Sequence, residues 1–305
     1  MEIKRVGIVG SGTMGSRISF QCGRCGMGVN LYDVDPQAVD TALKLIQTWY
    51  KEHLPPEEAE RALSCIRRCD DLAECLSDAG IVIENVPENL ELKRKVFAEM
   101  DRLAPPHVLL ATNSSSLPSS RIADATIRPD KVFNVNFGDP REDRLVEVMF
   151  HDKVTDTTRA AVEEFLKSIK MVPIITEKEI MGFSFNRTWR AIKREVLHLV
   201  GDGYSNFEDI DRAWIMLFGT KWGPFGLMDD IGLDVIRDIE NQYYEDSDEK
   251  RDKPPRFLDD MIARGRLGAK AGRGFYRHPN PEYLQEGWLT KEPPWSPDQK
   301  IRLDD

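Results

Sequence analysis

The first residues whose spacing could do chemistry lie close to the N-terminus, where Gly10, Gly12 and Gly15 follow a short apolar run. This G-x-G-x-x-G spacing is typical of a strand-to-helix turn that binds the pyrophosphate of a dinucleotide. Thr13 and Met14 begin the helix, whose free N–H groups favour negative charge. A lone glycine fingerprint also fits a plain surface turn, so its neighbours must decide between the two.

An acidic residue supports the dinucleotide site. Asp33 ends the next apolar run, 18 residues after Gly15, near the spacing at which a carboxylate binds the adenosine ribose hydroxyls. Asp35 adds negative charge that would repel a 2′-phosphate. We therefore expect NAD rather than NADP as the cofactor, bound at the five residues of the turn and at Asp33.

Alternating elements follow along the first half of the chain. Short, nearly continuous apolar runs favour buried parallel strands, and helical patterns separate them. This alternation predicts a Rossmann-type, doubly wound, mostly parallel sheet. The expected strands are Val6–Val9, Val29–Tyr32, Ile81–Ile83, Val108–Ala111, Val132–Val135, Val146–Met149 and Val172–Ile175, and the expected helices are Thr13–Cys25, Pro36–Tyr50, Leu90–Leu103 and Thr157–Ile169.

Helical periodicity dominates the rest of the chain, so we expect a cofactor domain over 1–178 and a smaller all-α domain over 179–305. The expected helices are Phe185–Leu199, Glu208–Phe218, opened by a capping box that starts at Ser205, and Leu227–Tyr244. The tail from Pro279, with Pro293-Pro294 and Ser296-Pro297, is expected to be extended and peripheral.

Composition excludes several classes of protein. The net charge of −10 argues against nucleic acid as a partner. No apolar run approaches the roughly 18 residues that a membrane helix needs, and no signal segment precedes the first strand. The five cysteines are an odd number, which favours free thiols in a reducing, cytoplasmic compartment. Cys22 and Cys25 have C-x-x-C spacing without a second ligand pair, so we expect no metal.

Several further motifs, in this order, resemble those of the NAD-dependent L-3-hydroxyacyl-CoA dehydrogenases over nearly the whole chain. They are Glu84–Asn89 with Lys93, Asn113–Leu117, Gly182–Arg187, Gly223–Leu227 with Gly232–Asp234, and Gly265–Tyr276. The resemblance implies oxidation of a 3-hydroxyacyl thioester, or a related 3-hydroxy acid, by hydride transfer to NAD.

The resemblance also implies roles for particular residues. Glu88, Lys93 and Asn113 would lie near the nicotinamide half of the cofactor. Ser115 and Asn186 would bond the 3-oxygen and thioester region of the substrate. Alternatively, the serines around Ser115 form a plain polar turn and Asn186 caps a helix.

One position departs from the family pattern. The family's general base is a His in H-F-x-N-P, oriented by a Glu in L-V-E-V. Here Asn136 stands at the His position, Asp139 at the Asn position, and Glu147 matches the orienting Glu. An Asn amide can bond the substrate oxygen but cannot take its proton, and losing such a base costs about 10²–10⁴ in rate. His151 is the His nearest to this segment, and we expect it at the surface.

Two classes of function remain open. The chain is a dehydrogenase with an altered site, in which Asn136 is natural and Glu147 or Asp139 serves as base, or in which Asn136 is an introduced substitution. Alternatively, it is a catalytically weak or inactive NAD-binding homologue with a structural or sensing role. Gly138 and Asp139 indicate a reshaped acyl pocket.

The acyl carrier is equally open. Pro55-Pro56 splits the region after the second strand into a projecting helical pair, and CoA would need basic residues on this pair. Acidic residues are interleaved among the basic ones. The alternative substrate is a smaller 3-hydroxy acid without CoA. The basic residues are Lys44, Lys51, Arg61, Arg67 and Arg68.

The second domain carries more apolar helix surface than one small helical layer can bury, which favours an interface. The resemblance implies a homodimer through this domain. The residues are Trp214, Ile215, Leu217, Phe218, Ile231, Val235 and Ile236.

Overall fold

The computed structural model describes residues 2–247 and 249–291. The described residues divide into two compact units, with the boundary between Phe185 and Asn186. The boundary expected between residues 178 and 179 lies just before this division.

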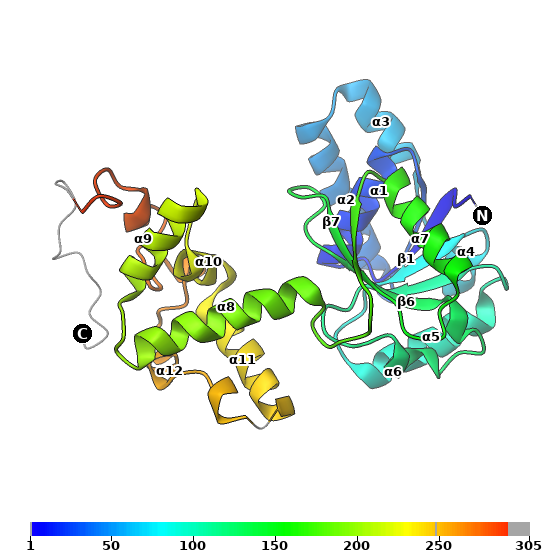
Figure 1. Ribbon diagram of the computed structural model, residues 1–305. Coiled ribbons are helices and arrows are strands. Elements are labelled where there is room, and N and C mark those ends of the chain that lie inside the picture. Colours follow the sequence, from blue (N-terminus) through cyan, green and yellow to red (C-terminus); the bar gives the residue numbers. More distant parts are fainter. Residues whose placement is uncertain (1, 248, 292–305) are drawn as a thin grey trace. The chain divides into compact units, whose positions relative to one another are not determined.

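The first unit is built on one sheet, shown in Figure 1. In the described part of the chain, eight strands pair in the order β3-β2-β1-β4-β5-β6-β7-β8. Neighbours from β3 to β6 are parallel, β7 is antiparallel to β6, and β8 is parallel to β7. The predicted doubly wound, mostly parallel sheet is confirmed. The strands are β1 (Arg5–Val9), β2 (Gly28–Tyr32), β3 (Ile66–Arg68), β4 (Ile81–Glu84), β5 (Leu109–Thr112), β6 (Val132–Phe137), β7 (Leu145–Met149) and β8 (Val172–Thr176).

Helices cover both faces of this sheet because successive strand side chains point to opposite faces. Ile81 and Ile83 pack with α1, α2, α3 and α7, whereas Val82 between them packs with α4, α5 and α6. Burial on both faces explains why the strands read as continuous apolar runs. The helices are α1 (Thr13–Arg24), α2 (Pro36–His53), α3 (Pro56–Ser64), α4 (Leu72–Leu76), α5 (Leu90–Leu103), α6 (Ser120–Ala123) and α7 (Asp156–Ser168).

Strand β3 was not expected from the sequence. It has three residues and lies at the sheet edge, where Arg67 and Arg68 are exposed and pair with Asp78 and Asp40. Such a short, charged edge strand lacks the apolar pattern that marks the others.

The helical pair after the second strand is present. Asp35 caps α2 by accepting a hydrogen bond from the Gln37 N–H at 2.9 Å. Helices α2 and α3 pack against each other and against α1 (Figure 1), and the buried Tyr50 hydroxyl of α2 donates to the Phe20 carbonyl at 2.8 Å.

The second unit is helical, but two details differ from expectation. The expected helix 227–244 is broken at Gly232, whose φ of +105° ends α10. Asn206, not Ser205, caps α9, because its side chain accepts a hydrogen bond from the Asp209 N–H at 2.8 Å. The helices are α8 (Ser184–Gly201), which begins in the first unit, α9 (Phe207–Phe218), α10 (Pro224–Ile231), α11 (Leu233–Ser247) and α12 (Arg256–Ala263).

Two buried carboxylates connect the segments of the second unit. Asp211 of α9 accepts hydrogen bonds from two N–H groups at the start of α10 and from the Tyr276 hydroxyl. Asp229 of α10 accepts from the Phe275 and Tyr276 N–H groups, both at 2.8 Å. The G-P-F and G-F-Y motifs therefore supply backbone donors to these acids.

The tail is not peripheral where it is described. Trp288 is fully buried, its carbonyl accepts from Arg212 Nε at 2.9 Å, and the Arg212 guanidinium lies over its ring. Expectations for residues 293–297 fall outside the described residues. Among residues 2–247 and 249–291, no helix is long and apolar enough to cross a membrane.

Candidate active site and cofactor site

The glycine turn between β1 and α1 has the geometry that a pyrophosphate site requires. Gly10 has a φ of +96°, and its N–H donates to the Tyr32 carbonyl at 2.9 Å. A Cβ on Gly15 would lie 1.9 Å from the Gly10 carbonyl oxygen, so only glycine lets helix and turn meet there. A Cβ on Gly12 would meet nothing within 4 Å, which leaves the backbone open to a phosphate.

The start of α1 fits an anion. Gly12 is the N-cap, so no side chain caps the helix, and no acid lies in the first turn. Thr13 is exposed and Met14 is half-buried. Asp33, at the end of β2, accepts from the Ser11 N–H at 2.7 Å and from its hydroxyl at 3.1 Å. These residues fit NAD, with Asp33 fixed beside the turn.

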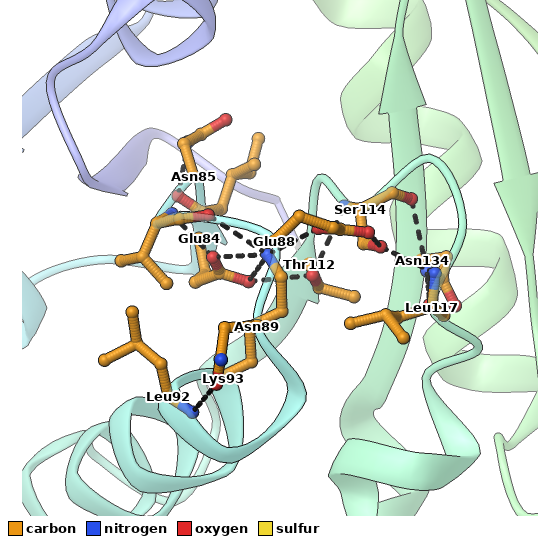
Figure 2. A network of polar contacts seen from close by, with 12 residues as sticks. Glu84, Asn85, Glu88, Asn89, Leu92, Lys93, Thr112, Ser114, Leu117 and Asn134 are labelled. Atoms are coloured by element: carbon orange, nitrogen blue, oxygen red, sulfur yellow. Dashed lines mark hydrogen bonds and ion pairs between the residues drawn. The ribbon is translucent and has the colours of Figure 1, made fainter. Parts of the chain in front are cut away.

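A buried ion pair joins β4 to α5 and is shown in Figure 2. Lys93 Nζ lies 2.8 and 3.1 Å from the two carboxylate oxygens of Glu84, and both side chains are almost fully buried. The Thr112 hydroxyl of β5 donates to Glu84 at 2.7 Å. Burial raises the pKa of Glu84, and the Lys93 charge and these hydrogen bonds oppose that rise. The pair fixes the carboxyl ends of β4 and β5.

Glu88 connects this pair to the serine loop after β5 (Figure 2). Its carboxylate accepts from the hydroxyls of Ser114 and Ser116 and lies 3.3 Å from Lys93 Nζ. Burial opposes ionisation of Glu88, but these hydroxyl donors and Lys93 outweigh it and lower the pKa. Ser115 lies between the two bonded serines and is exposed, so it alone of the three faces outward.

Two asparagines brace the same loop. The Asn113 side chain accepts from the Phe137 N–H at 3.0 Å. The buried Asn134 of β6 accepts from the Ser119 N–H at 2.7 Å and donates to the Leu117 carbonyl at 2.9 Å. Hydrogen bonds therefore fix the loop on both sides of Ser115.

Asn136 and Glu147 face each other across β6 and β7. They are register partners, and Asn136 Nδ2 lies 3.4 Å from Glu147 Oε2. Glu147 Oε1 accepts from the Phe185 N–H at 2.8 Å and is 3.4 Å from the Ser184 hydroxyl. Because Glu147 is only 1% exposed, it holds Asn136 and the first turn of α8 and does not reach solvent.

Asp139 is enclosed by cations. Arg141 donates to its carboxylate at 3.0 and 2.6 Å, and Arg17 Nε lies 3.3 Å away. Burial opposes ionisation of Asp139, but Arg141 and Arg17 outweigh it and lower the pKa. Gly138 is also constrained, since a Cβ there would lie 2.6 Å from the Asp143 carboxylate. The space of the missing side chain is therefore filled by Asp143.

His151 is not a surface residue, contrary to expectation. It follows Phe150 just beyond β7, and the two side chains are 3% and 2% exposed. The apolar strand continues past its hydrogen-bonded end, which carries His151 into the interior. Among the described residues, His151 makes no hydrogen bond or ion pair with Asn136 or Glu147.

The predicted site residues fall into three groups. The glycine turn and Asp33 lie together, Glu88, Lys93, Asn113 and Ser115 lie together, and Asn136 and Glu147 are paired. Asn186 opens the second unit. Sequence reasoning assigned no role to Glu84, Thr112 or Asn134. Glu84 could have been identified from the sequence, because its carboxylate comes directly at the end of an apolar strand.

Comparison with known proteins identifies the family. Residues 5–180 match the sequence model described as "3-hydroxyacyl-CoA dehydrogenase, NAD binding domain", and residues 182–278 match "3-hydroxyacyl-CoA dehydrogenase, C-terminal domain". A 3-hydroxybutyryl-CoA dehydrogenase of Mycobacterium tuberculosis is 32% identical over 284 residues, which cover 90% of this chain and 99% of that protein.

Two solved structures have the same fold. The (S)-3-hydroxybutyryl-CoA dehydrogenase from Ralstonia eutropha has a TM-score of 0.83 and 31% identity, covering 90% of this chain and 99% of its own. A diketoreductase acting on dicarbonyl compounds has a TM-score of 0.83 and 33% identity, covering 91% of this chain and all of its own. The chain therefore belongs to the 3-hydroxyacyl-CoA dehydrogenase family, whose cofactor is NAD.

Proposed function

We propose that this enzyme oxidises the 3-hydroxyl group of a 3-hydroxyacyl-CoA, or of a related 3-hydroxy acid, to the 3-keto product, with a turnover limited by its general-base position. The observation that carries this proposal is the Asn136–Glu147 pair. By the resemblance of the motifs, this pair corresponds to the family's His–Glu pair.

The proposed roles are those that the family resemblance implies. Bound NAD supplies the hydride acceptor. The open backbone at Gly12 takes the pyrophosphate, and Asp33 takes the adenosine ribose. Glu88, Lys93 and Asn113 lie beside the nicotinamide half, while Ser115 and Asn186 orient the substrate oxygen and thioester region.

Proton removal is the weak step. The Asn136 amide orients the substrate oxygen but does not accept its proton. Asp139 is a poor base, because Arg141 and Arg17 stabilise its ionised form. Glu147 is buried and already accepts from the Phe185 N–H. The proton therefore leaves to solvent, which slows the reaction relative to a site with a positioned base.

The substrate class is tested by direct assay. NADH formation should be followed with 3-hydroxybutyryl-CoA and with free 3-hydroxybutyrate. Slow formation from either one supports the proposal and identifies the acyl carrier. If NAD binds but neither the protein nor its Asn136→His variant forms NADH, the chain is the alternative, an NAD-binding homologue with a structural or sensing role.

We also propose a homodimer through the second unit. Leu217 and Phe218, at the end of α9, are 79% and 64% exposed, and Val235 is 40% exposed, which supports an apolar interface. Ile236, expected in that interface, is instead fully buried in the core. Sedimentation at micromolar concentration tests the dimer, and a monomer mass would refute it.

A cytoplasmic location completes the proposal. All five cysteines are unpaired, which supports a reducing compartment. Fractionation of the producing cells tests this location.

A further inference from the structure

A row of three polar side chains crosses the sheet of the first unit. Glu84 of β4 is the register partner of Thr112 of β5, and Thr112 is the register partner of Asn134 of β6. All three side chains are fully buried, and register partners on parallel strands point to the same face. The Thr112 hydroxyl donates to Glu84 at 2.7 Å. Asn134 instead directs its amide to the serine loop, residues 113–119 (Figure 2).

The Asn134 side chain makes its hydrogen bonds, within the described structure, to backbone groups of that loop. Its Oδ1 accepts from the Ser119 N–H at 2.7 Å, and its Nδ2 donates to the Leu117 carbonyl at 2.9 Å. The Ser114 carbonyl lies 3.5 Å from the same Nδ2. Because the amide is buried, its donor and its acceptor both need partners, and the loop supplies them. Asn134 therefore specifies the backbone path of the loop from Ser114 to Ser119.

Ser115 differs from the other serines of the loop in its hydroxyl group. The other three serines donate to the carboxylates of Glu88 and Glu179. Ser115 is exposed, and its hydroxyl has no hydrogen-bond partner among residues 2–247 and 249–291. The loop therefore presents this hydroxyl to solvent or to a ligand, while its backbone is fixed by the buried Asn134 amide.

The strand that carries Asn134 also carries Asn136. The two residues are separated by one position on β6, so their side chains point to the same face of the sheet. Asn136 is paired with Glu147 of β7, both in register and through its amide. One strand therefore determines the position of Asn136 and, through the Asn134 amide, the position of the loop that carries Ser115.

We propose that Asn134 is a positioning residue, which fixes the Ser115 hydroxyl relative to the side chain at position 136 so that both meet the same substrate oxygen. This role rests on the proposed function, in which Ser115 and Asn136 orient that oxygen. Asn134 does not itself touch the substrate, because it is fully buried. Its effect on the reaction rate must therefore pass through Ser115, and this dependence can be measured.

A double-mutant cycle with Ser115 tests this role, with NADH formation followed on whichever of 3-hydroxybutyryl-CoA and 3-hydroxybutyrate the protein oxidises. Asn134→Leu keeps the size of the side chain and removes its hydrogen bonds. It should lower kcat about 10-fold to 10²-fold, since a misplacement of about 1 Å can cost that much in rate. In the Ser115→Ala background the same substitution should lower kcat no further, because the hydroxyl that it misplaces is absent. Additive effects on kcat would overturn the role.

Asn30→Leu is the matched control, because Asn30 is another fully buried asparagine of the same sheet, on β2. Its amide also bonds through both ends: Nδ2 donates to the Cys75 carbonyl at 2.9 Å, and Oδ1 accepts from Arg5 at 3.1 Å. Both substitutions should lower the midpoint of urea unfolding, but only Asn134→Leu should lower kcat. Equal losses of kcat would assign the effect to the loss of any buried amide and would contradict the role.

Asn134→Asp is the conservative variant and replaces Asn134→Leu in the cycle if the latter does not fold. It keeps an acceptor for the Ser119 N–H and loses the amide donor to the Leu117 carbonyl. It should lower kcat less than Asn134→Leu does, and the loss should again vanish in the Ser115→Ala background. Turnover that neither substitution changes would overturn this role alone. If neither the protein nor its Asn136→His variant forms NADH, the proposed function fails and this role fails with it.

Discussion

Glu84 and Glu147 are two buried carboxylates on the same sheet, and they differ in what neutralises them. Glu84, at the end of β4, has the Lys93 ammonium at 2.8 Å. Glu147, on β7, has only the Phe185 N–H, the Ser184 hydroxyl and the Asn136 amide. No ion pair to Glu147 occurs among the described residues. One carboxylate has a cation, and the other faces Asn136, the position at which the family resemblance implies a chargeable His.

This difference separates a pair that stabilises the fold, Glu84–Lys93, from a pair that we propose takes part in catalysis, Asn136–Glu147. A buried ion pair with complete hydrogen bonding fixes geometry, and removing one partner leaves an uncompensated charge. The Glu84–Lys93 pair therefore fixes the carboxyl ends of β4 and β5, beside which we propose that the nicotinamide half binds. The Asn136–Glu147 pair, which we propose lies at the catalytic position, joins β6 to β7 without an imidazole.

Removing the Lys93 cation that neutralises Glu84 should have the largest effect. Lys93→Met should lower the free energy of unfolding by about 3–5 kcal/mol, because Glu84 would stay buried and unpaired. Urea denaturation measures the loss. The double variant Glu84→Gln/Lys93→Met is the control and should recover most of it. A single variant as stable as the parent would show that the pair does not hold the fold.

The second test supplies Glu147 with a chargeable partner at position 136. Asn136→His should raise dehydrogenase turnover about 10²-fold, the usual worth of a positioned base, and should introduce a pH dependence in the imidazole range. Steady-state NADH formation measures both. Glu147→Gln in that background should remove much of the gain, since the two side chains act together. Unchanged or lower turnover in Asn136→His would mean that the site uses another base.

Local patterns predicted much of this molecule. The glycine turn, the alternation of strands and helices and the end of α5 at Leu103 follow from periodicity and turn residues that lie close in sequence. The position of Asn136 opposite Glu147 followed from the family pattern, and the strand register pairs the two.

The features that the sequence did not predict depend on contacts between residues far apart in the chain. Gly232 breaks a helix whose apolar pattern continues, and nearby Asp229 is bonded to backbone some 46 residues away. Trp288 is buried by Arg212 and Tyr276, which no local pattern links to it. The Arg17–Asp139–Arg141 cluster likewise joins a helix to a loop far along the chain.

Asp211 and Asp229 of the second unit are a third kind of buried carboxylate. Among the described residues, Asp211 accepts from two backbone N–H groups and the Tyr276 hydroxyl, and Asp229 and its partner His278 lie in the same network. Burial raises the pKa of Asp211 to about 7 and that of Asp229 to about 6, against the lowering effect of their donors. Because no ion pair to Asp211 occurs in the described part of the chain and burial raises its pKa, its ionisation opposes folding.

The sign of the pH effect follows. A carboxyl whose pKa is higher in the folded state stabilises that state at low pH, and the contribution is lost as pH rises through the folded value. Asp211 and Asp229 should each lower the free energy of unfolding by up to about 1.4 kcal/mol per pH unit as pH rises from the ordinary carboxyl range to about 7 and about 6, respectively. Urea unfolding at a series of pH values measures this slope. Asp211→Asn should flatten it, and an unchanged slope would assign the dependence to other groups.

The smallest expected effect concerns Asp139, the remaining candidate for a base. It differs from Glu147 in being enclosed by Arg141 and Arg17, which lower its pKa and keep it ionised through the neutral range. A carboxylate stabilised in this way has little tendency to take a proton from an alcohol.

Asp139→Asn should therefore leave turnover nearly unchanged and lower the free energy of unfolding by about 1 kcal/mol, the upper range for a partly exposed ion pair. Steady-state assays and urea unfolding on the same preparation separate the two effects. Arg141→Gln, which removes a clamp residue and leaves the carboxylate, is the matched control and should show the same small loss of stability. A fall in turnover of about 10²-fold in Asp139→Asn, without such a fall in Arg141→Gln, would make Asp139 the base that replaces the missing His.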